Sequence, residues 1–288
     1  MKYGVNRTIT EALQNIEDRV PGAFRIRLLS EVLDDPDDRK QAHEIVDKYR
    51  ADVVIWGNYN VTDAHALVST KVLTLIDCNC KYLSPFSEYR LESGVPTTKE
   101  RIDDFRLQKQ ISEQIAALVL MSVAGQQYEE EHIESAIRIA DMALRYPTLD
   151  NAVRSDLLIV RGLAAWRANM KDVSLKDFGA AVSAQPTNAR AHVGLAVAQY
   201  TAGDNVGAVA SCSRALKYDP TNGLAYWVRA SAYKDMKDFD SATKDFEVLL
   251  KLETRSKPPD GSLAYDAREA IEQMQIARRN GPLTATPH

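Results

Sequence analysis

A 34-residue interval between matching residues constrains the fold of this 288-residue chain more than any other feature. Pro186 and Pro220 lie 34 residues apart, and each closes a stretch with helical spacing. With Pro220 set as position 32, small residues recur at positions 8 and 20 of three successive units. They are Gly162 and Ser174, then Ala196 and Ala208, then Ala230 and Ala242. Because two helices approach closely only where side chains are small, this interval predicts stacked helical hairpins.

Larger residues occupy the intervening positions, as expected where side chains fill the space beside a tight crossing. Tyr226 stands at position 4, Leu195 at position 7, Tyr233 at position 11, and Phe178 and Phe246 at position 24. A 34-residue helix–turn–helix with this pattern resembles the tetratricopeptide repeat. The resemblance covers residues 107–253 and is specific for fold, not for ligand.

The predicted fold class is α+β. A small N-terminal α/β sheet domain is expected at residues 1–97, followed by an all-α tetratricopeptide superhelix at residues 98–288. We expect about four hairpins over residues 100–253 and a capping helix at 262–280 that shields the last apolar surface. The loop Thr148–Arg154 is longer than the repeat requires, which predicts a bend there.

The N-terminal part mixes helical and strand periodicities. Amphipathic helices are expected at residues 8–20 and 36–49, with an alternating strand between them. Ala51–Gly57 is a continuous apolar run typical of a covered strand, and Leu67–Ile76 alternates as a long strand. Tyr82–Leu91 is a candidate edge strand, although Pro85 disfavours it.

The segment Asp47–Thr70 resembles a region of STAND-type bacterial signalling ATPases that lies between the NTPase module and a tetratricopeptide array. The similar residues are Lys48–Ala51, Asp52–Tyr59 and the strands that follow. The segment is also distantly similar to the N-terminal domain of TolB. The resemblance implies the sensor or adaptor half of a signalling system and does not carry over ATP hydrolysis.

Composition and charge favour a soluble, cytoplasmic protein. The net charge is −4 and the pI is about 5.8, without the basic excess of nucleic-acid or membrane-surface binders. We therefore expect neither nucleic acid nor membrane as a partner. Met1–Val20 lacks the pattern of a secretory leader, and the apolar run Ile111–Gly125 is too short to span a bilayer. Three cysteines argue against a disulfide framework.

Motifs for catalysis are missing from the sequence. No glycine-rich run ends in Gly-Lys-Ser/Thr, and the histidines lack paired ligand spacing. His192 and Cys212 are expected in the core, and Cys78 and Cys80 are expected as small apolar residues of a strand. The acidic cluster Asp34–Asp38 favours a helix N-terminus. We therefore predict a non-enzymatic protein with no catalytic residue, cofactor or metal site.

In the tetratricopeptide resemblance, positions 2, 5, 9 and 12 of each first helix face a concave groove. Here the candidate partner-binding residues at these positions are Ile159, Leu163, Trp166, Arg190, Val193, Val197, Tyr200, Leu224, Trp227 and Lys234. Asp156 and Ser231 complete the set. Trp166, Tyr200 and Trp227 are expected anchors, with Arg190 and Lys234 as a polar rim. These helices do not present the Lys, Asn and Arg set with which chaperone-binding members clamp a carboxylate.

The leading functional hypothesis is a non-catalytic adaptor or scaffold whose groove docks a peptide or helix of a partner protein, in a bacterial signalling or regulatory assembly. The alternative is a ligand-sensing domain in which the N-terminal unit binds a small molecule and the repeats relay it. Coverage of the groove by the N-terminal domain or by a second copy of the chain, as a homo-oligomer, also stays open.

Overall fold

The computed structural model describes residues 11, 14, 44, 48, 53–61, 66–74, 89–91, 105–253 and 261–279. The chain divides into two compact units, Met1–Asn169 and Met170–His288. The domain boundary predicted at residue 97 falls inside the first unit and outside the described residues. The helices predicted at 8–20 and 36–49 lie outside them too, apart from isolated helical residues such as Glu11 and Glu44.

The first unit contains a three-stranded antiparallel sheet of order β1-β2-β3. Strand β1 (Val53–Val61) pairs along its whole length with β2 (Ala66–Thr74), and the short β3 (Tyr89–Leu91) pairs with the other edge of β2. The extended segments predicted at Ala51–Gly57 and Leu67–Ile76 overlap β1 and β2. The central strand is therefore β2, whereas β1 lies at an edge.

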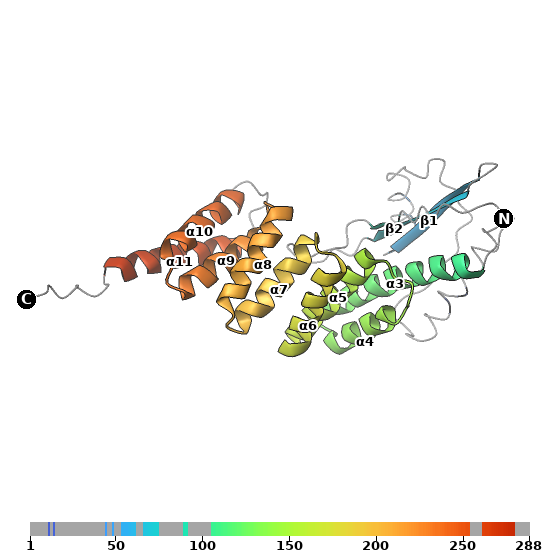
Figure 1. The fold of residues 1–288 in the computed structure, drawn as a ribbon, viewed down its shortest axis with the longest axis horizontal. Helices are drawn as coiled ribbons and strands as arrows, with labels where there is room; N and C mark the ends of the chain where they lie inside the picture. Colours follow the sequence, from blue (N-terminus) through green and yellow to red (C-terminus); the bar gives the residue numbers. More distant parts are fainter. Residues whose placement is uncertain are drawn as a thin grey trace, which may run out of the picture. The chain divides into compact units, whose positions relative to one another are not determined.

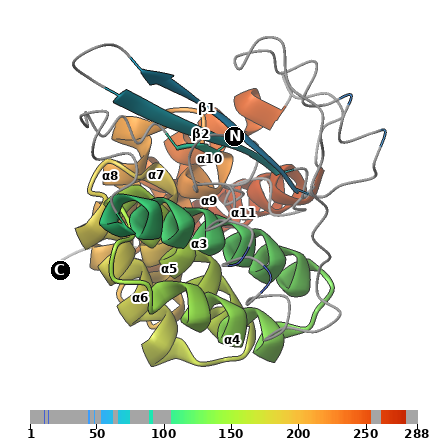
Figure 2. The ribbon, with the colours of Figure 1, turned by 90° about the vertical axis from the view of Figure 1, so that its right-hand side faces the viewer.

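Three helices of the first unit pack side by side (Figure 2): α3 (Phe105–Glu129), α4 (Ile133–Leu144) and α5 (Asn151–Arg167). Helix α3 contacts both α4 and α5, and its residues 114–125 are buried on every side. A helix that is apolar all round is one that its neighbours enclose. The core members that are completely buried include Ile115, Leu118, Met121, Ala140, Ala143 and Leu157.

The second unit is a run of helices that fold back on one another in sequence order (Figure 1). They are α6 (Lys171–Ala184), α7 (Ala189–Thr201), α8 (Asn205–Tyr218), α9 (Gly223–Asp235), α10 (Phe239–Glu253) and α11 (Gly261–Arg279). Helices α7 and α8 form one hairpin, and α9 and α10 form the next. Helix α11 packs on this last hairpin through Ala267, Ala270 and Met274.

The small residues at repeat positions 8 and 20 lie in shared clusters, as the sequence predicts. Ala196 of α7 and Ala208 of α8 belong to one cluster, and both are 0% exposed. Ala230 of α9 and Ala242 of α10 belong to another, again at 0% exposure. The close-packing prediction is confirmed for these two hairpins.

The turn between the two helices of each hairpin has one residue with positive φ, and these residues mark the repeat. They are Glu131, Asn169, Gly203 and Lys237. Asn169, Gly203 and Lys237 follow one another at intervals of 34 residues, whereas Glu131 precedes Asn169 by 38. The four additional residues lie in α5, which has 17 residues where α7 and α9 each have 13. The loop predicted at Thr148–Arg154 is therefore shorter than expected, because α5 already begins at Asn151. Side chains of Asp150, Asn188, Asp204 and Asn222 cap the helices that follow.

Lys237 holds a left-handed conformation at φ 64° that Gly203 adopts in the preceding turn at φ 85°. Because a side chain makes this conformation unfavourable, Lys237→Gly should raise the free energy of unfolding by about 1 kcal/mol. The reciprocal change, Gly203→Ala, should lower it by a similar amount. Urea denaturation followed by circular dichroism measures both. If both variants changed the free energy of unfolding in the same direction, the left-handed conformation would not explain the effect.

Candidate partner-binding site

The structure separates the candidate groove residues by burial. In the first unit, Ile159 is 0% exposed and Leu163 is 9% exposed, whereas Trp166 at the end of α5 is 41% exposed. In the second unit Val193 is 0% exposed. Ile159 and Val193 therefore present no surface to a partner in this structure. The remaining candidates are half-buried, namely Arg190, Val197, Tyr200, Leu224, Trp227 and Lys234.

Four of these half-buried side chains come together on the neighbouring first helices α7 and α9. Val197 and Tyr200 of α7 and Leu224 and Trp227 of α9 all pack against the same cluster, built on Ala196 and its neighbours. The Tyr200 and Trp227 rings meet edge to face, with centroids 6.5 Å apart and planes at 84°. We call these four residues the α7–α9 surface. Partly exposed aromatic side chains on a rigid helical support are suited to anchoring a partner.

The Tyr200 hydroxyl lies near two polar residues of α9, Ser231 and Asp235, both of which influence its ionisation. Burial, followed by the negative charge of Asp235, raises the pKa of the Tyr200 phenol above its usual value. The phenol therefore stays neutral, while its ring contacts Trp227 of α9 edge to face.

A recess of about 220 Å³ lies beside this surface, between α9, α10 and α11. Trp227, Ser231 and Lys234 of α9 form one side, and these are positions 5, 9 and 12 of the last repeat. Residues of α11 and Phe246 of α10 complete the lining. Residues of α11 therefore share a recess with three groove positions of the last repeat.

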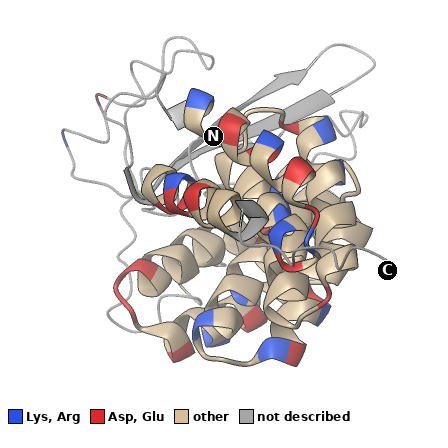
Figure 3. Cartoon of the chain, turned by 90° about the vertical axis from the view of Figure 1, so that its left-hand side faces the viewer, with Lys and Arg blue, Asp and Glu red and all other residues tan. Residues whose placement is uncertain are grey.

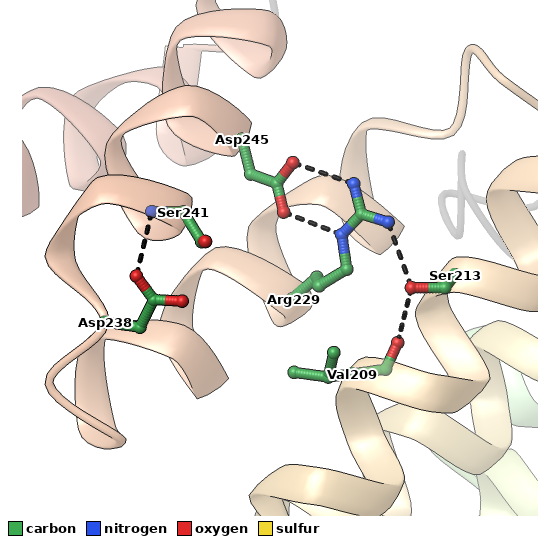
Figure 4. Close-up of polar contacts among 6 residues, drawn as sticks. All are labelled: Val209, Ser213, Arg229, Asp238, Ser241 and Asp245. Atoms are coloured by element: carbon green, nitrogen blue, oxygen red, sulfur yellow. Dashed lines mark hydrogen bonds and ion pairs between the residues drawn. The ribbon is translucent and has the colours of Figure 1, made fainter.

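An arginine bridge, which the sequence did not predict, fixes the orientation of α9 (Figure 4). Arg229 of α9 donates two hydrogen bonds to Asp245 of α10, at 2.7 Å and 2.8 Å. Its Nη1 donates to the Ser213 hydroxyl of α8 at 3.1 Å, and that hydroxyl donates to the Val209 carbonyl at 2.8 Å. One guanidinium therefore connects three consecutive helices. In the first unit Arg161 of α5 makes an ion pair with Asp141 of α4.

Two candidate reactive residues, His192 and Cys212, are core residues. His192 is 2% exposed, hydrogen-bonds through Nε2 to the Pro186 carbonyl at 2.9 Å, and stacks on Tyr218. Burial raises the pKa of the Cys212 thiol to about 12, which removes it as a nucleophile. Both core predictions are confirmed. Among the described residues, no group of His, Cys, Asp and Glu could hold a metal ion. Cys78, Cys80 and the Asp34–Asp38 cluster lie outside the described residues.

Charges of both signs are interspersed along the helices that face the viewer in Figure 3. No single-sign stripe of the kind that tracks a nucleic-acid backbone is visible on the described residues in this view. Within the described part of the chain, every helix is too short or too polar to cross a bilayer.

Residues 159–223 match the family model of the tetratricopeptide repeat, from α5 to the start of α9. Several solved structures are similar to the chain. The tetratricopeptide domain of Arabidopsis OM64 is 22% identical over 43% of this chain and 98% of that one, with a TM-score of 0.39. PcrH in complex with the chaperone-binding region of PopD is 22% identical, covering 42% and 90%, with a TM-score of 0.40. YrrB, described as having an unusual peptide-binding site, is 17% identical, covering 59% and 83%, with a TM-score of 0.44.

No curated protein matches the sequence. The matched family model lies outside Asp47–Thr70, so the expected STAND-type or TolB-like domain gains no support from it. The same holds for a role in signalling. A ligand site in the N-terminal domain stays a prediction, because the side chains of that domain lie outside the described residues. A homo-oligomer likewise stays a prediction.

Proposed function

We propose that this tetratricopeptide repeat protein is a non-catalytic adaptor that docks a peptide or amphipathic helix of a partner protein on the first helices of its repeats. The observation that supports it best is the α7–α9 surface, where Val197, Tyr200, Leu224 and Trp227 converge and stay partly exposed. Helical repeat arrays bind partners on the extended surface that successive repeats share. Aromatic residues at such a surface contribute a large part of the binding free energy.

Rigidity of the surface supports the same function. The Arg229 bridge holds α9 to both of its neighbours, α8 and α10. A surface fixed in this way loses little conformational entropy when a ligand binds, which favours affinity. The expected ligand is a short segment with apolar side chains that pack against Trp227 and Leu224.

Selection of end-blocked random peptides against the full chain tests the proposal. Trp227→Ala should weaken the binding of the selected peptides about 30-fold, equivalent to about 2 kcal/mol, because it removes a central anchor. The matched control is Tyr265→Ala on α11, which removes an aromatic side chain that is 67% exposed and lies outside the α7–α9 surface. Circular dichroism checks that both variants stay helical. If both bind the selected peptides as the wild type does, the α7–α9 surface is not the docking site.

A further inference from the structure

The recess at the end of the candidate groove carries an uneven set of charges. Its walls hold an aromatic ring, one lysine and two carboxylates, so the formal charge of the ionisable lining is negative. The lysine lies on α9, and both carboxylates lie on α11. The residues that matter for the argument are Trp227, Ser231, Lys234, Asp266, Glu269 and Gln273.

The two carboxylates are exposed and available to a ligand. Among the described residues neither Asp266 nor Glu269 has an ion-pair partner, and neither is paired with Lys234 across the recess. Glu269 accepts a hydrogen bond from Gln273 at 3.0 Å, which orients it and leaves its second oxygen open. Acidic groups at the mouth of an aromatic recess attract a cation by charge and by the negative face of the ring.

The lining favours a planar cation. The indole of Trp227 can stack on a guanidinium, and a carboxylate accepts two parallel hydrogen bonds from the same group. The aliphatic stem of an arginine would find apolar neighbours in Phe246 and Ala270, which also line the recess. A lysine ammonium could pair with the carboxylates but could not stack on the indole as a planar group does.

We propose that this recess binds the side chain of an arginine in the docked peptide, with Trp227 stacked on the guanidinium and Asp266 and Glu269 pairing with it. This inference rests on the proposed docking function and names the ligand chemistry at one end of the surface. Lys234 faces the same recess and opposes the incoming charge. It therefore weakens binding and makes the affinity for arginine lower than the carboxylates alone would give.

The peptide selection on the full chain tests the subsite separately from the groove. Enrichment of arginine at one position of the selected peptides is the expected result. Selected peptides that depend on Trp227 but carry no basic residue, or carry an acidic one, would reject the subsite and leave the docking function standing. A selection that yields no peptide sensitive to Trp227→Ala would reject both.

Variants that neutralise the acidic and the basic residues of the recess should change the affinity in opposite directions. With a selected arginine peptide, Asp266→Asn combined with Glu269→Gln should weaken binding about tenfold, whereas Lys234→Met should tighten it about threefold. Glu272→Gln is the matched control, because Glu272 is an exposed acid on α11 that does not line the recess. Replacing the arginine of the peptide by norleucine should abolish both effects. Weaker binding with Lys234→Met would show that the recess prefers an anion and overturn the assignment.

Discussion

Gly194→Ala should destabilise the second unit by about 2–3 kcal/mol, although alanine is the better helix former. A Cβ atom at Gly194 would lie within overlap distance of two Phe178 ring atoms and 3.0 Å from Phe178 Cγ. Phe178 is 1% exposed, so its ring lies inside the close-packed core and cannot turn out into solvent without losing that packing. Overpacking at this contact between α6 and α7 should therefore exceed the helix-propensity gain. Urea denaturation of the purified variant measures the loss.

Gly179→Ala is the matched control, because a Cβ atom at Gly179 meets nothing within 4 Å. It adds the same methyl group at a half-buried position of α6 and should raise the free energy of unfolding by about 0.5–1 kcal/mol. Combining Gly194→Ala with Phe178→Leu should cost less than the sum of the two single variants, since the smaller side chain relieves the overlap. A Gly194→Ala variant as stable as the wild type would show that α6 and α7 do not pack as described.

The repeat could be predicted from the sequence because the small residues that determine it recur at a fixed interval along the chain. Small residues every 34 positions report a backbone crossing directly, and Ala196, Ala208, Ala230 and Ala242 lie where that argument places them. The exposure of individual groove positions could not be predicted in the same way. Val193 and Tyr200 share one helix face, yet Val193 is completely buried, because exposure depends on how each helix tilts against the next.

The arginine bridge was missed for a physical reason, although the sequence contains a signal for it. Arg229 stands at position 7, where Leu195 stands in the preceding unit and an apolar residue is expected. A charged residue at a core position requires a partner, and that partner lies on another helix where no local spacing rule reaches. The same residue types recur at Arg161 and Asp177, two 34-residue units before Arg229 and Asp245. The printed ion pair of Arg161 is made with Asp141 of α4, so this recurrence in sequence does not by itself identify the partner.

Asp245→Ala should lower the free energy of unfolding by about 3 kcal/mol, because it leaves the Arg229 guanidinium without its main partner. The two side chains are only 19% and 10% exposed, so water replaces the lost hydrogen bonds poorly. Arg229 would keep its bond to Ser213 and its position 5.7 Å from the Tyr226 ring centroid, which limits the loss. Chemical denaturation at neutral pH measures the effect. The matched control is Glu131→Gln, which neutralises an ion pair whose carboxylate is 76% exposed and should change the stability by less than about 0.5 kcal/mol.

The double variant Arg229→Met with Asp245→Leu tests whether this ion pair only stabilises the fold or also orients α9 for peptide binding. Removing both charges avoids the desolvation of each, so the double variant should be more stable than Asp245→Ala alone. If the pair serves mainly to orient α9, the double variant should also bind the selected peptides less tightly than the wild type, even with its stability recovered. If the affinity for the peptide changed in parallel with the stability in every variant, the bridge would serve only to stabilise the fold. Because Trp227 and Arg229 lie on the same helix, a small rotation of α9 would displace the indole from Tyr200 and from the recess together.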